Sequence, residues 1–178
     1  MKRVLVTGLS GTGKSTLIEG LAARGYKAVD ADYDGWSELR GVEGASRGSK
    51  SAPEQEWLWR EDRIQELLST EDAEVLFLSG CASNQAQFYP RFDYIVLLTA
   101  PVPLILERLA TRTNNHFGKG PDELAQILQD QRDVEPRLRR VADLEVDTSA
   151  SLDQLIATVL QFVLSGEESV RTAQPPSQ

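Results

Sequence analysis

The distribution of apolar and polar positions predicts strands and helices that alternate along the chain. Short apolar and β-branched runs indicate strands at 2–7, 26–31, 74–80, 92–100 and 144–148. Apolar residues at helical spacing indicate helices at 14–24, 54–68, 101–111, 121–140 and 152–164. The runs at 74–80 and 92–100 are almost continuously apolar, which is typical of strands covered on both faces. The pattern therefore predicts a three-layer α/β fold, with a five-stranded parallel sheet between helices.

Length and composition favour one domain. The chain has 178 residues, of which 40% are hydrophobic, and this is enough for one buried core. We expect the domain to span 1–165, with an insertion at about 35–70 that contains a mobile loop rich in Gly, Ser and Pro at 41–55. Residues 166–178 are expected to form a disordered tail.

The charge of the chain limits its partners. Its 27 acidic and 19 basic residues give a net charge of -8, which argues against binding to nucleic acid or to a membrane surface. No apolar stretch approaches the roughly 20 residues of a membrane span. The single cysteine, Cys81, cannot form an internal disulfide. We expect a cytoplasmic protein, and the sequence leaves open whether it is a monomer or a dimer.

Residues 8–15, GLSGTGKS, carry the clearest chemical signal, because they lie between the first predicted strand and the first predicted helix. In that context the pattern G-x-x-x-x-G-K-[ST] predicts a phosphate-binding P-loop, whose backbone N–H groups and helix N-terminus face phosphate oxygens. Lys14 is expected to reach the β- and γ-phosphates of ATP and Ser15 to bind Mg²⁺. The predicted nucleotide ligands in this segment are Gly8, Ser10, Gly11, Thr12, Gly13, Lys14, Ser15 and Thr16. The sequence thus predicts a P-loop NTPase fold with ATP and Mg²⁺ as cofactors.

Two missing features favour phosphoryl transfer over other uses of a nucleotide. A GTPase needs a guanine-reading N-K-x-D motif late in the chain, and residues 144–151, LEVDTSAS, contain none. A motor ATPase usually has an acidic residue after its third strand, whereas residues 75–84, VLFLSGCASN, contain no carboxylate. A kinase is therefore the favoured interpretation.

Three acidic residues follow the second predicted strand. In an extended segment, alternation would place Asp30, Asp32 and Asp34 on one side, beside the P-loop. We expect Asp32 to help position Mg²⁺ and Asp34 to orient an attacking hydroxyl, both with catalytic roles, and Asp30 to be a strand-end residue. A solvated acidic turn is the alternative.

Basic residues late in the chain could compensate the charge of ATP. Arg108 and Arg112 lie one helical turn apart and are expected to face the nucleotide, with Arg112 also stabilising the transferred phosphoryl group. Residues 112–120 are polar, with glycines on both sides of Lys119, and indicate a hinged lid. A solvated helix end is the alternative for the two arginines.

These residues resemble the small P-loop kinases, which include nucleoside-monophosphate kinases, shikimate kinase and gluconate kinase. The resemblance covers the P-loop, the D-x-D at 30–32 or 32–34, the small-residue turn at 79–81, the arginine-rich segment at 108–119 and the EVDTS at 145–149. It implies a kinase fold, a substrate contact at Gly80, and an arginine after the lid that touches phosphate or acceptor. Arg132 and Arg137 are equal candidates for that arginine.

The acceptor is expected to bind at 35–70. On a helix over 54–68, Trp59 and Arg63 would share a face, and they are predicted to clamp the acceptor or to form a surface stack. Arg60 is the alternative anion ligand, and Trp57 is expected in the core. The resulting prediction is an ATP-dependent kinase for a small molecule, with transfer to a hydroxyl. The alternatives are a nucleoside-monophosphate kinase and a nucleotide-binding regulatory module with little turnover.

Overall fold

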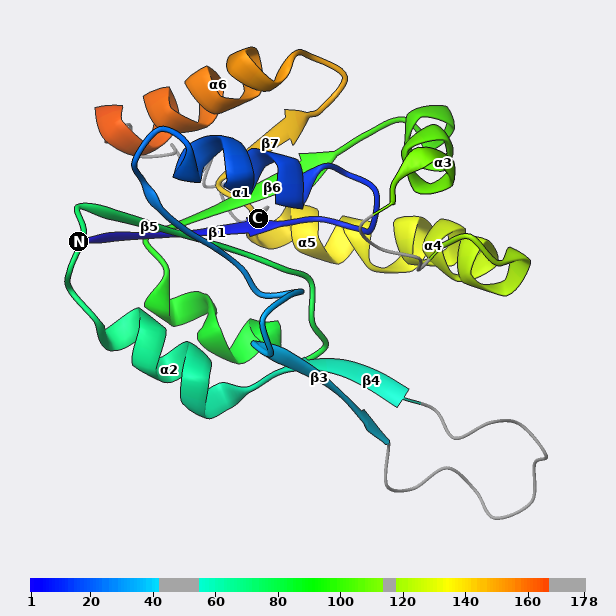
Figure 1. Ribbon diagram of the computed structural model, residues 1–178, viewed down its shortest axis with the longest axis horizontal. Coiled ribbons are helices and arrows are strands. Elements are labelled where there is room, and N and C mark those ends of the chain that lie inside the picture. The colour runs from blue at the N-terminus through cyan, green and yellow to red at the C-terminus, as the bar shows by residue number, and fades with distance from the viewer. Residues whose placement is uncertain (42–54, 114–117, 167–178) are drawn as a thin grey trace, which may run out of the picture.

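A computed structural model describes residues 1–41, 55–113 and 118–166. Its centre is a sheet of five parallel strands (Figure 1), in the order β2 (Lys27–Asp30), β5 (Val75–Ser79), β1 (Lys2–Thr7), β6 (Tyr94–Thr99) and β7 (Leu144–Asp147). All residues of β5 are buried, which agrees with its almost continuous apolar sequence. The predicted five-stranded parallel sheet is confirmed.

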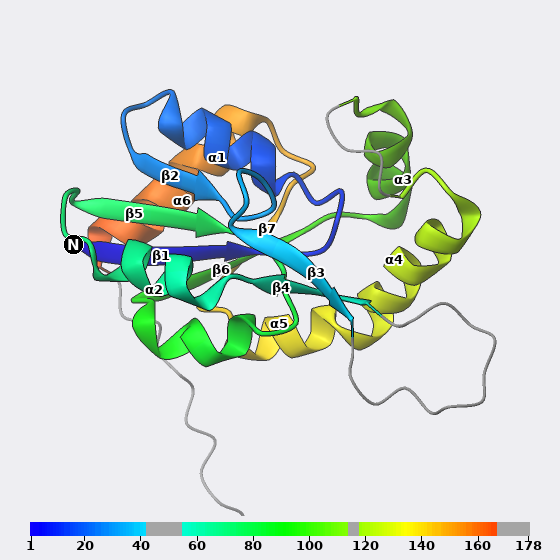
Figure 2. The same ribbon diagram turned by 60° about the horizontal axis from the view of Figure 1, so that its bottom comes forward.

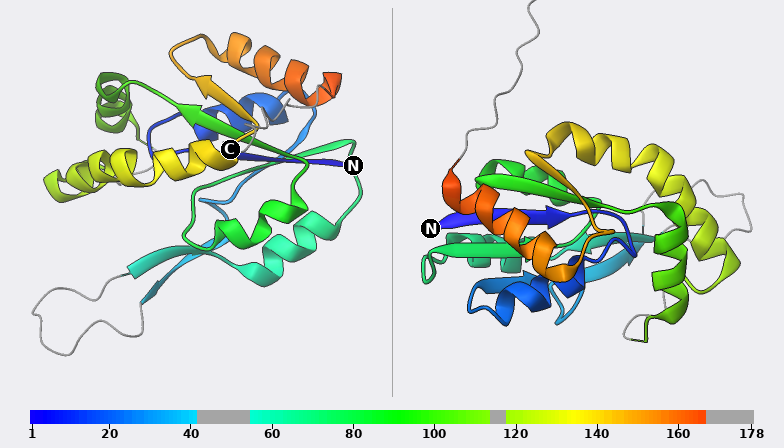
Figure 3. Two further views of the ribbon diagram at one scale, coloured as in Figure 1. Left: turned by 180° about the vertical axis from the view of Figure 1, so that it is seen from behind. Right: turned by 90° about the horizontal axis from the view of Figure 1, so that it is seen from above.

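Helices cover both faces of this sheet. On one face α1 (Lys14–Ala22) and α6 (Leu152–Ser165) pack on Val4 and Val6 of β1. On the other face α2 (Glu61–Ser69) and a 3₁₀ helix (Gln85–Arg91) pack on Leu5. The view from behind shows α2 and α6 on opposite sides of the strands (Figure 3). The predicted three layers are therefore present, although the 3₁₀ helix was not predicted.

Three further helices lie between β6 and β7 in the chain. They are α3 (Val102–Thr111), α4 (Pro121–Asp133) and α5 (Glu135–Val141). The first agrees with the helix predicted at 101–111, whereas the other two replace the single helix predicted at 121–140. The prediction is wrong at Val134, where the helix breaks. Pro136 lies in the first turn of α5, and it has no N–H to donate to a preceding helical carbonyl.

The insertion differs most from the prediction. Residues 54–68 do not form one helix, because β4 (Gln55–Trp59) pairs with β3 (Ser37–Gly41) in an antiparallel hairpin (Figure 2) and α2 begins only at Glu61. The change occurs at Arg60, whose backbone is extended. The aromatic pair Trp57 and Trp59 suits a strand, since both side chains pack on the same face of the hairpin.

The predicted mobile loop at 41–55 falls almost entirely outside the described residues, and the predicted tail does so from residue 167. Within the described part of the chain, no helix combines the length and the apolar character needed to cross a membrane.

Candidate nucleotide and acceptor site

The P-loop joins the C-terminal end of β1 to the N-terminus of α1. Glycine is required at its start, because a Cβ on Gly8 would lie 2.4 Å from the carbonyl oxygen of Leu98 on β6. Gly11 and Gly13 have φ values of 84° and 95°, in the left-handed region that favours glycine. Gly13 is also the N-cap of α1, so the free N–H groups of the first helical turn point towards this loop.

Lys14 is buried, with 7% of its surface exposed, although it is charged. Its ammonium donates to the carbonyl oxygens of Gly8 at 2.8 Å and Leu9 at 3.2 Å. These bonds hold the Lys14 ammonium group against the backbone of the P-loop. Thr12 is also buried, and its hydroxyl donates to the same Leu9 oxygen at 2.8 Å.

A cavity of about 350 Å³ opens over the P-loop. It brings together eight of the ten predicted nucleotide ligands, namely Ser10, Gly11, Gly13, Lys14, Ser15, Thr16, Arg108 and Arg112, together with the predicted catalytic residue Asp32. Gly8 and Thr12, the other two predicted nucleotide ligands, are not part of its lining. The sequence did not predict six other lining residues, which are Tyr33, Thr111, Thr148, Ala150, Leu152 and Leu155. Four of these lie at the turn between β7 and α6 or in α6, where only the resemblance at 145–149 signalled a site.

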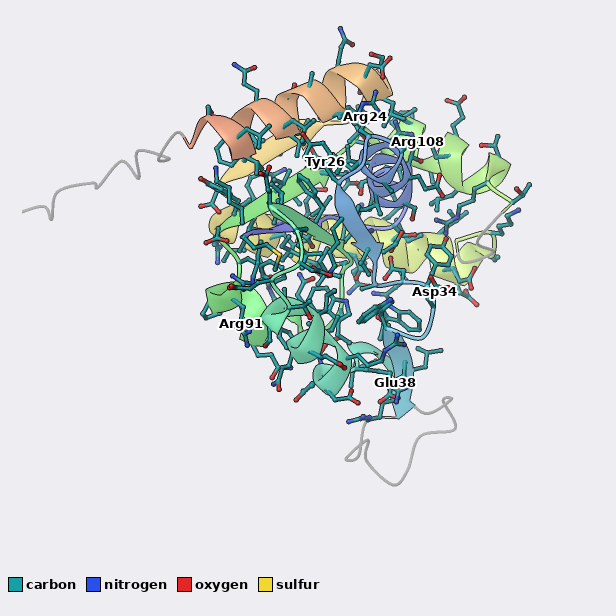
Figure 4. All side chains as sticks on the ribbon, turned by 60° about the vertical axis from the view of Figure 1, so that its left-hand side comes forward. Arg24, Tyr26, Asp34, Glu38, Arg91 and Arg108 are labelled. Carbon is teal, nitrogen blue, oxygen red and sulfur yellow. The ribbon has the colours of Figure 1, made fainter. Side chains whose placement is uncertain are left out.

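Arg108 connects three parts of this cavity. Its guanidinium donates to the carbonyl oxygen of Thr148 at 2.7 Å, to the hydroxyl of the same residue at 2.8 Å, and to the carbonyl oxygen of Gly11 at 3.4 Å. Figure 4 shows Arg108 above the P-loop helix. Arg108 therefore ties α3 to the P-loop and to the end of β7.

Arg112 reaches the same cavity from the end of α3. Its Nη2 donates to the Ser10 hydroxyl at 3.3 Å. Burial lowers the pKa of the Arg112 guanidinium, and the nearby Tyr33, Asp32 and Glu123 act in the opposite direction. Since an arginine stays protonated even so, Arg112 supplies a second positive charge at the cavity wall.

The three aspartates do not share one side of an extended segment, so this prediction is wrong. β2 ends at Asp30, whose Oδ1 accepts from the backbone N–H of Asp32 at 3.1 Å in the turn that follows. Asp32 lines the cavity, and its Oδ1 accepts from Trp57 Nε1 at 3.1 Å. Asp34 is exposed, has a φ of 53° and lies outside the cavity lining (Figure 4).

The predicted acceptor residues are arranged differently from the prediction. Trp59 is 1% exposed, and a Cβ on Gly80 would lie 2.8 Å from its Nε1, so its ring is packed in the core and cannot clamp an acceptor. Trp57, predicted in the core, is only half-buried. The prediction assumed a helix, in which Trp57 and Trp59 would point in different directions. In strand β4 both point to the same face of the hairpin.

Arg63 stacks on a different ring from the one predicted. Its guanidinium lies 4.1 Å from the ring centre of Trp36, and its Nη1 donates to the carbonyl oxygens of Asp34 and Gly35, each at 2.8 Å. Arg63 therefore fixes the turn after β2. Arg60, at the start of α2, is exposed.

Only parts of the predicted lid are described, since residues 114–117 lie outside the described ranges. At its end, Glu123 accepts from the backbone N–H groups of Gly118 at 2.8 Å and Gly120 at 3.2 Å. These bonds lower the pKa of the Glu123 carboxyl. Lys119 is exposed.

The arginines after the lid are not brought to the cavity. Arg132 and Arg137 are exposed and absent from its lining. Arg139 pairs instead with Glu135 at 2.9 Å and with Glu145 at 2.7 Å. Among the described residues there is no group of three or more His, Cys, Asp or Glu that could hold a metal ion by itself.

Sequence comparison gives a relative that is a kinase. The chain is 29% identical over 196 residues to the dephospho-CoA kinase of Helicobacter pylori strain J99, covering 90% of this chain and 95% of that protein. This relative is a small kinase.

Solved structures share the fold. Shikimate kinase from Acinetobacter baumannii, in complex with shikimate, has a TM-score of 0.63 at 23% identity, covering 94% of this chain and 95% of that chain. A gluconokinase from Sinorhizobium meliloti 1021 has a TM-score of 0.56 at 23% identity, covering 92% of both chains.

The predicted resemblance to the small P-loop kinases is thus confirmed, and the relatives support phosphoryl transfer of the kinase type. A family match covers most of the chain, including the P-loop, the turn after β2, Arg108 of α3 and Arg112 at the end of that helix. Residues 4–129 match the family AAA_18, an AAA domain, and the chain belongs to this family.

Proposed function

We propose that this protein is an ATP-dependent kinase that transfers the γ-phosphoryl group of Mg-ATP to a hydroxyl of a small molecule. The observation that carries the proposal is the convergence of Lys14, Arg108 and Arg112 on one cavity, with the carboxylate of Asp32 in the same lining. A chain with a net charge of -8 concentrates cations there, as a polyanionic substrate requires.

The cavity is suited to ATP over its whole length. The P-loop amides and the N-terminus of α1 would bind the phosphates, and Lys14 would exchange its bonds to the Gly8 and Leu9 carbonyls for bonds to the β- and γ-phosphates. The apolar side chains of Leu152 and Leu155 line the same cavity and offer a surface for the base.

The donor set also fits Mg²⁺. The Ser15 hydroxyl lines the cavity and would bind the ion, and the Asp32 carboxylate in the same lining would help position it through a water ligand; Mg²⁺ prefers such oxygen ligands together with substrate phosphates and water. When bound, the ion would neutralise charge on the phosphates.

The chain's own residues would supply the remaining chemistry. Asp32 would orient the acceptor hydroxyl and accept its proton, since Asp34 lies outside the cavity lining. Arg112 would stabilise the charge that spreads over the transferred phosphoryl group. The acceptor would enter from the side of β4 and of Gly80, because the indole of Trp57 reaches Asp32 from there.

The decisive experiment measures ADP formation by the purified protein with Mg-ATP and a panel of sugars, hydroxy acids, dephospho-CoA and nucleoside monophosphates. We expect turnover that depends strictly on one hydroxyl acceptor. Turnover with nucleoside monophosphates alone would support the first alternative. Tight ATP binding with no acceptor-dependent turnover would support a regulatory module and refute the proposal.

A matched control identifies the site of turnover. Lys14→Ala removes the cation of the loop while leaving its backbone intact, so acceptor-dependent ADP formation should fall by at least about a hundredfold, in the range seen for loss of one transition-state contact. A Lys14→Ala protein with unchanged turnover would show that the activity comes from elsewhere.

A further inference from the structure

The indole of Trp57 contacts the one aspartate that lines the cavity in the turn after β2. Its Nε1 donates to Asp32 Oδ1 at 3.1 Å, across 25 positions of sequence. A hydrogen bond to an ionised carboxylate is among the stronger ones in proteins. A donor fixed on one carboxylate oxygen also determines where the second oxygen points.

Hydrogen bonds hold β4, which carries Trp57, against the segment that follows β5. The carbonyl oxygen of Trp57 accepts from the N–H of Ser83 at 2.9 Å. Two residues on, the side-chain amide of Asn84 bonds to both the N–H and the carbonyl oxygen of Trp59, each at 2.9 Å. These bonds fasten β4 to the segment that follows β5. The backbone of Trp57 is therefore fixed by its contact with the segment that follows β5.

The turn itself is held on its other side. Asp30 Oδ1 accepts from the Asp32 N–H, and the hydroxyl of Ser37 donates to the Ala31 carbonyl at 2.6 Å. The backbone of Asp32 is thereby fixed close to the P-loop. The backbone bonds leave the side-chain torsions of Asp32 to be fixed by the contact with the indole.

We propose that Trp57 is a positioning residue, whose indole N–H orients the Asp32 carboxylate towards the acceptor hydroxyl. This inference rests on the proposed function, since it gives Asp32 its role in transfer. It assigns to the β3–β4 hairpin a part in catalysis, in addition to any contact that the hairpin makes with the acceptor. The hydrogen bond from Trp57 to Asp32 thus connects the β3–β4 hairpin with the residue proposed to act on the acceptor hydroxyl.

The contact can be tested without turnover. The chain has three tryptophans, so an indole ¹H–¹⁵N spectrum holds three signals, and Trp57→Phe identifies the one from Trp57. We expect Asp32→Ala to shift this signal and to speed exchange of its proton with water by roughly tenfold or more, because a charged acceptor is lost. The same signal with unchanged shift and exchange would refute the hydrogen bond.

The consequence for transfer is tested with the acceptor found in the panel. Trp57→Phe keeps an aromatic ring but removes the donor, so kcat should fall roughly tenfold, equivalent to about 1.4 kcal/mol, while KM for ATP stays nearly unchanged. Trp36→Phe is the matched control, because it also removes an indole N–H from the insertion but keeps an aromatic ring on which Arg63 can stack, and it should keep kcat. Circular dichroism checks that each variant is folded.

A double-mutant cycle separates positioning from support of the fold. If Trp57 acts through Asp32, then Trp57→Phe should have almost no further effect on kcat in an Asp32→Ala background. Additive losses would refute the proposal. If the wild-type protein turns over but Trp57→Phe keeps its kcat, the positioning role fails alone. If the wild-type protein turns over no acceptor at all, the proposed function fails first and this inference fails with it.

Discussion

The replacement Arg108→Ala tests whether the cavity is held together by the arginine that spans it. The change removes two short hydrogen bonds, of 2.7 and 2.8 Å, to Thr148 and a longer one, of 3.4 Å, to Gly11. The Thr148 hydroxyl keeps a partner, because it also donates to the Thr99 carbonyl at 3.2 Å. The Thr148 carbonyl loses the strongest of the three bonds.

The expected size follows from these contacts. Arg108 is half-buried, so we take about 1 kcal/mol for each short bond, near the middle of the range for net hydrogen-bond contributions, and neglect the long one. The free energy of unfolding should fall by about 2 kcal/mol, and the melting temperature by roughly 4–8 °C for a chain of this size. If ATP binds as proposed, the stabilisation gained on adding Mg-ATP should also shrink, since Arg108 lines the cavity over the P-loop.

Urea unfolding, with and without Mg-ATP, measures both effects. Arg40→Ala is the control, because Arg40 is an exposed residue on β3 that pairs only at the surface with Glu38, and it should change the unfolding free energy by less than about 0.5 kcal/mol. If Arg108→Ala and Arg40→Ala unfold alike, Arg108 does not hold the cavity together and the reasoning from its contacts is wrong.

Three further predictions use other parts of the structure. Gly80→Ala should lower the free energy of unfolding by about 1–3 kcal/mol in urea, because its Cβ would meet the buried ring of Trp59 at 2.8 Å. Burial raises the pKa of the Cys81 thiol, against the opposing charge of Lys14, so iodoacetamide at about pH 8 should modify the native protein at least roughly tenfold more slowly than the protein unfolded in urea; equal rates would contradict this. The N–H groups of Gly120 and Gly118 lower the pKa of the Glu123 carboxyl below its unfolded value of 4.5, so the stabilisation from these hydrogen bonds is fully present above pH 4.5 and is lost as the pH falls through the lower pKa of the folded state. Amide protection of residues 118 and 120, measured by hydrogen exchange, should therefore decrease in acid and be lost in Glu123→Ala, which has no side-chain acceptor. Protection that is unchanged in both cases would rule the contact out.

The parts of the site that depend on local sequence could be predicted. The P-loop lies within eight consecutive residues, and its glycines, lysine and serine have no other common purpose in that order between a strand and a helix. The pair Arg108 and Arg112 was found for a similar reason, since helical spacing alone places both on one face. In these cases the residues that act together are near one another in the chain.

The parts that depend on distant contacts could not be predicted. β4 pairs with β3 across the segment 42–54, and no local pattern in the sequence indicates that pairing. Glu54 and Glu56, which precede Trp57, are helix formers and led to the prediction of a helix here. The bond between Trp57 and Asp32 follows from that pairing, so the error about the element hid the contact. Thr148 is 40 positions from Arg108, and no spacing rule joins a threonine at a strand end to an arginine in a helix.

The order of strands in the sheet also decides when the site can first exist during synthesis. β1 carries the P-loop, but its neighbours are β5 and β6, so the first strand made has no partner until residues 75–79 and 94–99 have left the ribosome. The hydrogen bonds from Arg108 to Thr148 can form only after the residues that follow β7 have been made. A nascent chain stopped at about residue 100 should therefore not retain ATP, whereas one that exposes α6 should. The P-loop is thus made early but depends on contacts with segments that are made much later.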